Sequence, residues 1–221
     1  MSTPTRFWDR AEGGRVLARK LRKHAGRSDV LVLGLPRGGV PVAHEVAQVL
    51  GLPLDVYVVR KLGVPGREEL AMGAIGSGGI RVLNTDVIAS LGISDDTIEA
   101  VAARESLELA RREQAFRRGR PPLDVRGRTV ILVDDGIATG ATLRAAILGL
   151  RKAGAQRIVA AVPVASASAA DLLRDDVDEF IAVSIPTEFR SVGEWYDRFP
   201  QTTDREVSAL LDSSLHPDPV N

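Results

Sequence analysis

Short apolar runs rich in Val, Ile and Leu alternate with longer helical patterns along most of the 221-residue chain. Five of these runs lie at residues 29–34, 54–59, 129–133, 157–164 and 179–184. Runs that are apolar at nearly every position are typical of strands buried on both faces, and helices between such strands indicate right-handed parallel crossovers. The sequence therefore predicts an α/β fold in which helices flank a central parallel sheet of five strands.

Helical patterns fill most of the stretches between these runs. Apolar residues recur at helical spacing in residues 14–24, 41–50, 94–117 and 141–153, and glycine or proline marks several of their ends. A chain of this length is typical of one domain. We expect a single domain over residues 1–215 and a disordered tail at 216–221.

Composition excludes several classes of protein. The chain has no Cys, which excludes disulfides, thiolate metal sites and a Cys nucleophile. No apolar run approaches the roughly 20 residues that a membrane-spanning helix needs, and the first residues lack the apolar stretch of a signal peptide. We therefore expect a cytoplasmic protein with no membrane partner.

Charge is balanced overall but not along the chain. Residues 1–27 carry eight Lys or Arg against two acidic residues, whereas residues 171–221 carry twelve acidic residues against four Arg. No basic tract is interleaved with aromatic residues, so a solvated helix face explains the basic segment better than nucleic-acid binding. We expect no nucleic acid partner; the basic first helix could instead meet the acidic C-terminal region of a second copy in a homodimer.

One segment fits neither helical nor strand periodicity. Residues 61–79 contain six Gly and one Pro, with charged residues in the middle. Long irregular loops inside a compact domain are usually functional lids or disordered insertions. We predict a flexible lid loop over about residues 61–80.

The motif that carries chemistry follows the apolar run at 129–133 and reads Asp134-Asp135-Gly136-Ile137-Ala138-Thr139-Gly140-Ala141-Thr142. The second half of this motif would begin a helix. The free N–H groups and the positive dipole end at that helix N-terminus would hold a phosphate, with Thr hydroxyls as further donors. The two carboxylates, at the carboxyl end of a parallel strand, could accept hydrogen bonds from sugar hydroxyls or from water on Mg²⁺. A phosphate beside a diol beside a metal describes a phosphorylated ribose.

Competing motifs are absent. A Walker A loop would need Lys after Gly140, and the glycines of residues 34–39 have the wrong spacing for a dinucleotide-binding fingerprint. The nucleophile elbow and the zinc-protease motif are also missing. The three His residues are isolated in sequence, so we predict no metal ligands among them.

At the acidic motif the sequence resembles the type I phosphoribosyltransferases, whose signature is a hydrophobic strand, two acids, two variable residues and an Ala/Thr/Asp-Thr-Gly-x-Thr/Ser loop. Residues 33–41 are similar to the family's pyrophosphate loop. Arg60-Lys61 lies where the family often has a basic residue that binds pyrophosphate, and the irregular segment lies where it has a flexible catalytic loop. Residues 189–196, Phe-Arg-x-Val-Gly-x-Trp-Tyr, are similar to a segment of a small group of uncharacterised bacterial phosphoribosyltransferase-like proteins.

The resemblance implies a type I phosphoribosyltransferase fold and a pentosyltransferase. Such an enzyme transfers the 5-phosphoribosyl group from 5-phospho-α-D-ribose 1-diphosphate (PRPP) to a nitrogenous base and releases pyrophosphate, with Mg²⁺ bound mainly through PRPP and water.

Site residues follow from the same resemblance. The 5′-phosphate would be bound by Gly136, Ala138, Thr139, Gly140, Ala141 and Thr142. The ribose hydroxyls and the metal's water would be bound by Asp134 and Asp135. Pyrophosphate would be bound by Arg37, Gly38, Gly39 and Lys61, under a lid that carries Arg67.

One departure bears on the choice of base. The 6-oxopurine enzymes have an Asp general base where this sequence has Ala138, and they read the purine oxygen with a Lys, whereas no Lys follows Lys152. Hypoxanthine and guanine are therefore disfavoured. By analogy with the adenine enzymes, Glu68 or Glu69 on the lid could act as base or orienting group.

Most aromatic residues lie near the ends of the chain. We expect a hood from about residues 1–12 and 185–212, in which Trp195 and Tyr196 could stack on a base or form a small second core. A catalytically silent protein that binds PRPP and acts as a regulator is the alternative to an active transferase.

Overall fold

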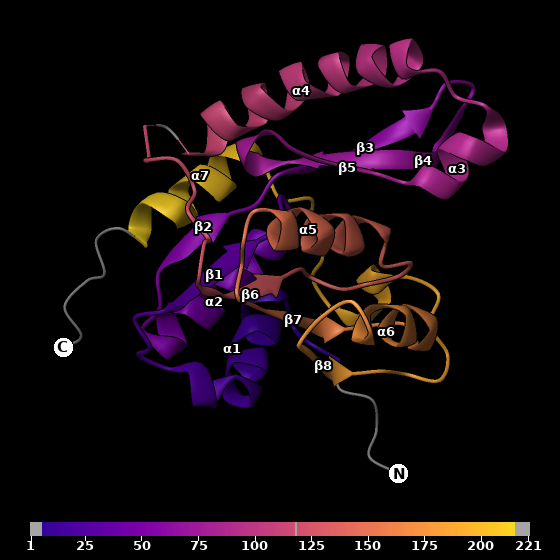
Figure 1. The fold of residues 1–221 in the computed structure, drawn as a ribbon. Coiled ribbons are helices and arrows are strands. Elements are labelled where there is room, and N and C mark those ends of the chain that lie inside the picture. The colour runs from indigo at the N-terminus through magenta and orange to yellow at the C-terminus, as the bar shows by residue number, and fades with distance from the viewer. Residues whose placement is uncertain (1–5, 118, 215–221) are drawn as a thin grey trace.

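A five-stranded parallel sheet forms the centre of the computed structural model, which describes residues 6–117 and 119–214 (Figure 1). The strand order is β2-β1-β6-β7-β8, and every neighbouring pair is parallel. The strands are β1 (Val30–Gly34), β2 (Leu54–Val56), β6 (Thr129–Val133), β7 (Arg157–Val164) and β8 (Glu179–Ser184). The predicted α/β class and sheet are confirmed, although β2 ends at Val56 and not at residue 59.

Helices cover both faces of this sheet because successive strand side chains point to opposite sides. Val30 and Val32 of β1 pack in one apolar cluster with α1 and α2, whereas Leu31 and Leu33 pack in the other with α5 and α6. The helices are α1 (Arg10–Lys20), α2 (Gly39–Leu50), α5 (Ala141–Lys152), α6 (Ala167–Arg174) and α7 (Asp204–Ser213), with short 3₁₀ helices η1 (Arg22–His24) and η3 (Val192–Trp195).

Local capping explains several of these boundaries. Asp9 precedes α1 and its carboxylate accepts a hydrogen bond from Glu12 N at 2.9 Å, so the helix begins four residues before the predicted residue 14. Thr203 and Glu206 form a capping box at the start of α7. Neither α6 nor α7 is predicted by the periodicity of the sequence.

The segment expected to have an irregular backbone is instead an ordered antiparallel sheet, so that part of the prediction is wrong, while the role of the segment as a lid stays a prediction. Strands β3, β4 and β5 pair in the order β3-β4-β5. Together with two helices they form a layer with these elements: β3 (Val59–Val64), β4 (Arg67–Gly76), η2 (Ser77–Gly79), β5 (Ile80–Leu83), α3 (Thr85–Leu91) and α4 (Asp95–Arg117).

Glycines interrupt the alternation of apolar and polar side chains by which these strands could have been predicted. A Cβ on Gly63 would lie 2.8 Å from Glu68 O of the paired strand, and one on Gly73 would lie 2.5 Å from Val82 O. Glycine is therefore needed for close approach of the strands, and it removes the side chains whose alternation would have indicated a strand.

The second layer lies above α5, so that α5 is placed between two sheets (Figure 1). The long helix α4 covers the outside of this layer and meets α7. Over the described ranges, no helix has the length and apolar character needed to cross a membrane. The predicted tail at 216–221 lies outside the described residues.

Candidate active site

The acidic pair lies where β6 ends, against the loop that follows β1. A Cβ on Gly38 would overlap the carboxylate of Asp135, and one on Gly39 would lie 2.7 Å from Val133 O and 2.8 Å from Asp134 Cα. Only glycine permits this contact. The structure therefore brings the expected pyrophosphate loop and the expected ribose-binding acids together at the carboxyl edge of the sheet.

Both carboxyl groups have raised proton affinity. Burial raises the pKa of Asp134 well above its ordinary value, and the carboxylate of Asp135 raises it further. Burial also raises the pKa of Asp135, while Arg10 opposes this shift. Asp134 Oδ1 accepts a hydrogen bond from Asp135 N at 2.9 Å. Buried acids with perturbed pKa values beside a loop edge are typical of functional sites.

Arg10 is a site residue that sequence reasoning missed. Its Nε lies 2.8 Å from Asp135 Oδ2, and its side chain is only 11% exposed. Nη1 donates to Pro200 O at 2.7 Å, and the guanidinium lies 3.8 Å from the ring centroid of Phe199. Arg10 is the first residue of α1, and no local pattern distinguishes it from the other basic residues of that segment.

Aromatic residues from both end segments pack around this arginine. Tyr196 donates its hydroxyl to Asp135 O, and its ring lies 5.0 Å from the ring of Phe199 and 5.6 Å from that of Phe7. Tyr196 is 2% exposed, and burial raises the pKa of its phenol, so it remains a donor. For Tyr196 the geometry fits the second-core alternative and not a ring that stacks on a base.

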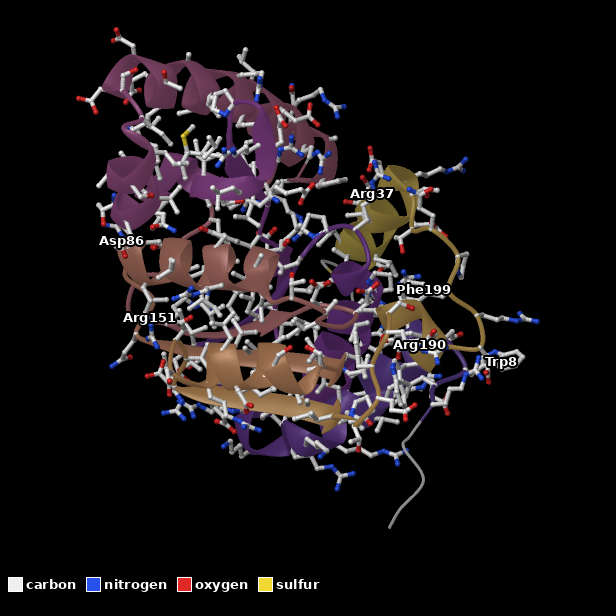
Figure 2. The ribbon with its side chains drawn as sticks, turned by 90° about the vertical axis from the view of Figure 1, so that its right-hand side faces the viewer. Trp8, Arg37, Asp86, Arg151, Arg190 and Phe199 are labelled. Atoms are coloured by element: carbon white, nitrogen blue, oxygen red, sulfur yellow. The ribbon has the colours of Figure 1, made fainter. Side chains whose placement is uncertain are left out.

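Trp195 joins the same group through its backbone, because Phe7 N donates to Trp195 O at 2.9 Å. Figure 2 shows Trp8 and Phe199 on one side of the molecule and Asp86 and Arg151 on the other. The two segments expected to form a hood are thus adjacent. A role of Trp195 in binding a base stays a prediction.

The expected phosphate loop begins α5. Gly140 lies at φ 77° directly before the helix, where a left-handed backbone favours glycine, and Ala141 is the first helical residue. Ser166 Oγ donates to Ala138 O at 2.7 Å and so ties the loop to the start of α6. The accessible residues of this loop are Ala138, Thr139, Ala141 and Thr142, which leaves the helix N-terminus open to a ligand.

A pocket of about 330 Å³ adjoins the start of α5 and contains several of the predicted residues. Lys61, Glu68 and Thr142 line it together with Arg60 and Arg104. Lys61 Nζ lies 3.3 Å from Glu69 Oε2, while Glu68 Oε1 accepts from Gly66 N at 3.2 Å.

Two other predicted residues lie apart from this pocket. Arg37 pairs with Asp204 of α7, with Nε and Oδ1 2.7 Å apart. Arg67 is exposed at the beginning of β4. Their predicted roles would require side-chain movement.

The donor set fits Mg²⁺ that is held partly by a substrate. The described residues contain no group of three or more His, Cys, Asp or Glu able to hold a metal ion. Mg²⁺ at phosphate sites is usually bound by one or two carboxylates together with phosphate oxygens and water. Asp134 and Asp135 supply that number of carboxylates at the edge of the sheet.

A parallel sheet with an acidic pair and the expected phosphate loop at its carboxyl edge is the arrangement of a known family, which comparison with family models identifies. The family model described as "Phosphoribosyl transferase domain" matches residues 9–194. The chain therefore belongs to the phosphoribosyl transferase family, and the resemblance found in the sequence is confirmed.

Similar proteins include one that is named after this family and one solved structure. The chain is 48% identical over 206 residues to "Putative phosphoribosyl transferase MT0597" of Mycobacterium tuberculosis, and the match covers 93% of this chain but only 46% of that relative. The chain thus spans less than half the length of this curated relative. Among solved structures, TT1426 from Thermus thermophilus has a TM-score of 0.85 and 45% identity, and the match covers 94% of this chain and 98% of that one.

Proposed function

We propose that the protein is a PRPP-dependent pentosyltransferase that transfers the 5-phosphoribosyl group to a nitrogenous base and releases pyrophosphate. The observation that carries this proposal is the close approach of the β1 loop to the acidic pair that precedes the expected phosphate loop. Gly38 and Gly39, about 95 positions earlier in the chain, lie so near Asp134 and Asp135 that a Cβ on either glycine would overlap them. Family membership alone would not require this arrangement to be intact.

Different residues bind different parts of PRPP in this proposal. The start of α5, with Thr139 and Thr142, binds the 5′-phosphate, and Asp134 and Asp135 accept from the ribose hydroxyls. Lys61 and the backbone of Gly38 and Gly39 bind the pyrophosphate. Mg²⁺, held by PRPP oxygens and by water on the acidic pair, would neutralise charge on the leaving group.

Positioning supplies most of the catalysis in this scheme. The ribosyl group passes through an oxocarbenium-like state as the bond to pyrophosphate breaks, so held phosphates at both ends align the reacting carbon with the base. Glu68 lines the pocket beside Lys61, and we assign to it the role of orienting the base or accepting its proton.

The direct test incubates the protein with PRPP, Mg²⁺ and a panel of bases and measures pyrophosphate release. We expect release with at least one base, and a loss of roughly 10²–10³-fold in kcat for Asp135→Asn, comparable to the loss of one transition-state contact. Asp171→Asn is the matched control, because Asp171 pairs with Arg174 on an exposed turn of α6. Release of no pyrophosphate with any base, or full activity in Asp135→Asn, would contradict the proposal.

A PRPP-binding regulator without catalysis is the second candidate. The observation in its favour is that Asp135 is already engaged by Arg10, together with the methyl side chain at Ala138. PRPP would then raise the melting temperature, and no base would support pyrophosphate release.

A further inference from the structure

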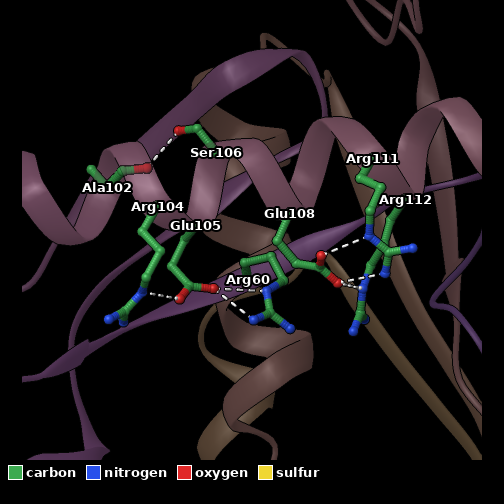
Figure 3. Close-up of polar contacts among 8 residues, drawn as sticks. All are labelled: Arg60, Ala102, Arg104, Glu105, Ser106, Glu108, Arg111 and Arg112. Carbon is green, nitrogen blue, oxygen red and sulfur yellow. Dashed lines mark hydrogen bonds and ion pairs between the residues drawn. The ribbon is translucent and has the colours of Figure 1, made fainter.

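The long helix α4 contributes one buried carboxylate to the pocket beside the phosphate loop. The side chain of Glu105 is 11% exposed, and Glu105 is the one charged residue among the buried residues described for α4. Its Oε2 accepts from Arg60 Nε at 2.9 Å and from Arg60 Nη2 at 2.6 Å (Figure 3). Its Oε1 accepts from Arg104 Nε at 3.2 Å. One carboxylate thus orients two arginines.

Arg60 lies where a substrate phosphate would pass. It is the second residue of β3, and it lines the pocket of about 330 Å³ together with Thr142 from the first turn of α5. The bonds to Glu105 use Nε and one hydrogen of Nη2, so both hydrogens of Nη1 and the second hydrogen of Nη2 are left for a ligand. Because an unrestrained Arg side chain has many rotamers, a guanidinium fixed in advance loses less freedom on binding.

We propose that Glu105 is a positioning residue of the phosphoribosyl transfer site, where it holds Arg60 for contact with a phosphoryl group of the substrate. This inference rests on the proposed function and adds α4 to the site. Either the pyrophosphate or the 5′-phosphate of PRPP would satisfy the chemistry, because both present phosphate oxygens to a guanidinium.

The same contact could serve only to fasten α4 to β3, and the chain offers a matched control for that role. Glu108, one turn further along α4, also accepts from two arginines, with Arg111 Nε and Arg112 Nε each 2.8 Å from its carboxylate (Figure 3). These partners lie on α4 itself, and Glu108 does not line the pocket. Glu105→Gln and Glu108→Gln therefore make the same chemical change on one helix.

The experiment is a double-mutant cycle with calorimetric binding of inorganic pyrophosphate and, separately, ribose 5-phosphate. The proteins are wild type, Glu105→Gln, Arg60→Gln, the double variant and Glu108→Gln. We expect Glu105→Gln to lower the affinity for at least one of the two ligands about tenfold, which is within the usual range for coupled neighbouring residues. In the Arg60→Gln background the same change should have little further effect, and Glu108→Gln should bind as wild type does.

The outcomes separate the two claims. If Glu105→Gln binds both ligands as tightly as wild type, or weakens binding equally in the presence and absence of Arg60, the positioning role is wrong and the proposed function stands. If wild type binds neither ligand and releases no pyrophosphate from PRPP, both fail. Arg60→Lys, which keeps the charge but not the bidentate contact, should fall between wild type and Arg60→Gln, and its folding can be checked by thermal denaturation.

Discussion

Asp134 is held where ionisation of its side chain costs free energy. The strand that leads to it is fully buried, and Asp134, directly after the strand, is itself partly buried. Its pKa is raised by that burial and by Asp135. A group that opposes folding in this way is retained where it serves a site, and such sites often trade stability for function.

Asp134→Asn is therefore expected to stabilise the fold while it abolishes transfer. Because the folded pKa lies above the unfolded one, the folded state binds more protons between the two values, and the free energy of unfolding falls as pH rises through that window. Asparagine does not titrate and can still accept from Asp135 N. We expect a gain of about 1–3 kcal/mol at about pH 8 that diminishes toward about pH 4.5. Urea denaturation of both proteins across this range measures it; a gain that shrinks as pH rises would contradict it.

Helix α5 is the element on which the phosphate loop depends, and it packs between two sheets. Tyr57, between β2 and β3, is 1% exposed and places its hydroxyl between the two layers. A Cβ on Gly149 of α5 or on Gly76 of β4 would overlap that oxygen. Within the described ranges the hydroxyl has no hydrogen-bond partner. Glycine is therefore required at both positions by the Tyr57 hydroxyl and not by helix or strand propensity.

The effect of Gly149→Ala on the free energy of unfolding should thus have opposite signs in the wild-type protein and in Tyr57→Phe. In wild type the new methyl meets the Tyr57 hydroxyl, and we expect a loss of about 1–3 kcal/mol, as for other overpacked sites. In Tyr57→Phe the nearest remaining contact is Cζ at 3.5 Å, so the helix propensity of Ala should give a gain of up to about 1 kcal/mol. Tyr57→Phe alone should be neutral or stabilising, because it removes a buried unpaired hydroxyl. Equal effects of Gly149→Ala in both backgrounds, measured by urea unfolding, would show that the hydroxyl is not the obstacle.

At the scale of the whole molecule, segments from near both ends of the chain converge on the site. Arg10 and Tyr196 bind the side chain and the backbone of Asp135, and further ion pairs join the same regions. Lys23 Nζ lies 2.6 Å from Glu179 Oε1, and Arg6 Nε lies 2.9 Å from Asp197 Oδ1. Part of the complementarity between the basic N-terminal and acidic C-terminal segments is thus satisfied within one chain.

Arg10→Gln should weaken the contact between the N-terminal segment and the site, and so lower the free energy of unfolding. Removing one partner of a largely buried ion pair leaves the other uncompensated, at a cost of about 2–4 kcal/mol here. Asp135→Asn in the same protein should recover much of the loss, because the carboxylate left without its partner is then removed. Both tryptophans, Trp8 and Trp195, lie in the converging segments, so their fluorescence during urea unfolding reports on the region directly.

Arg15→Gln is the control for the Arg10 variant, since Arg15 is half exposed and pairs with Glu45 on a neighbouring helix. It should cost less than about 1 kcal/mol. An Arg10→Gln variant as stable as Arg15→Gln, or one not rescued by Asp135→Asn, would show that the Arg10–Asp135 pair does not hold the end segments on the site.

The sequence by itself determined the central sheet and the identity of the motif at its edge. Strands buried on both faces need apolar residues at every position, and a phosphate loop needs glycine and threonine at the helix start, so both leave contiguous signals. The β3-β4-β5 sheet left none, because glycines such as Gly63, Gly73 and Gly76 are required by contacts with residues distant in sequence or on a paired strand. Only the tertiary structure decided that Arg10 meets Asp135 across 125 positions and that Glu105 meets Arg60 across 45. Such pairs depend on how whole elements pack, and local sequence carries no record of that packing.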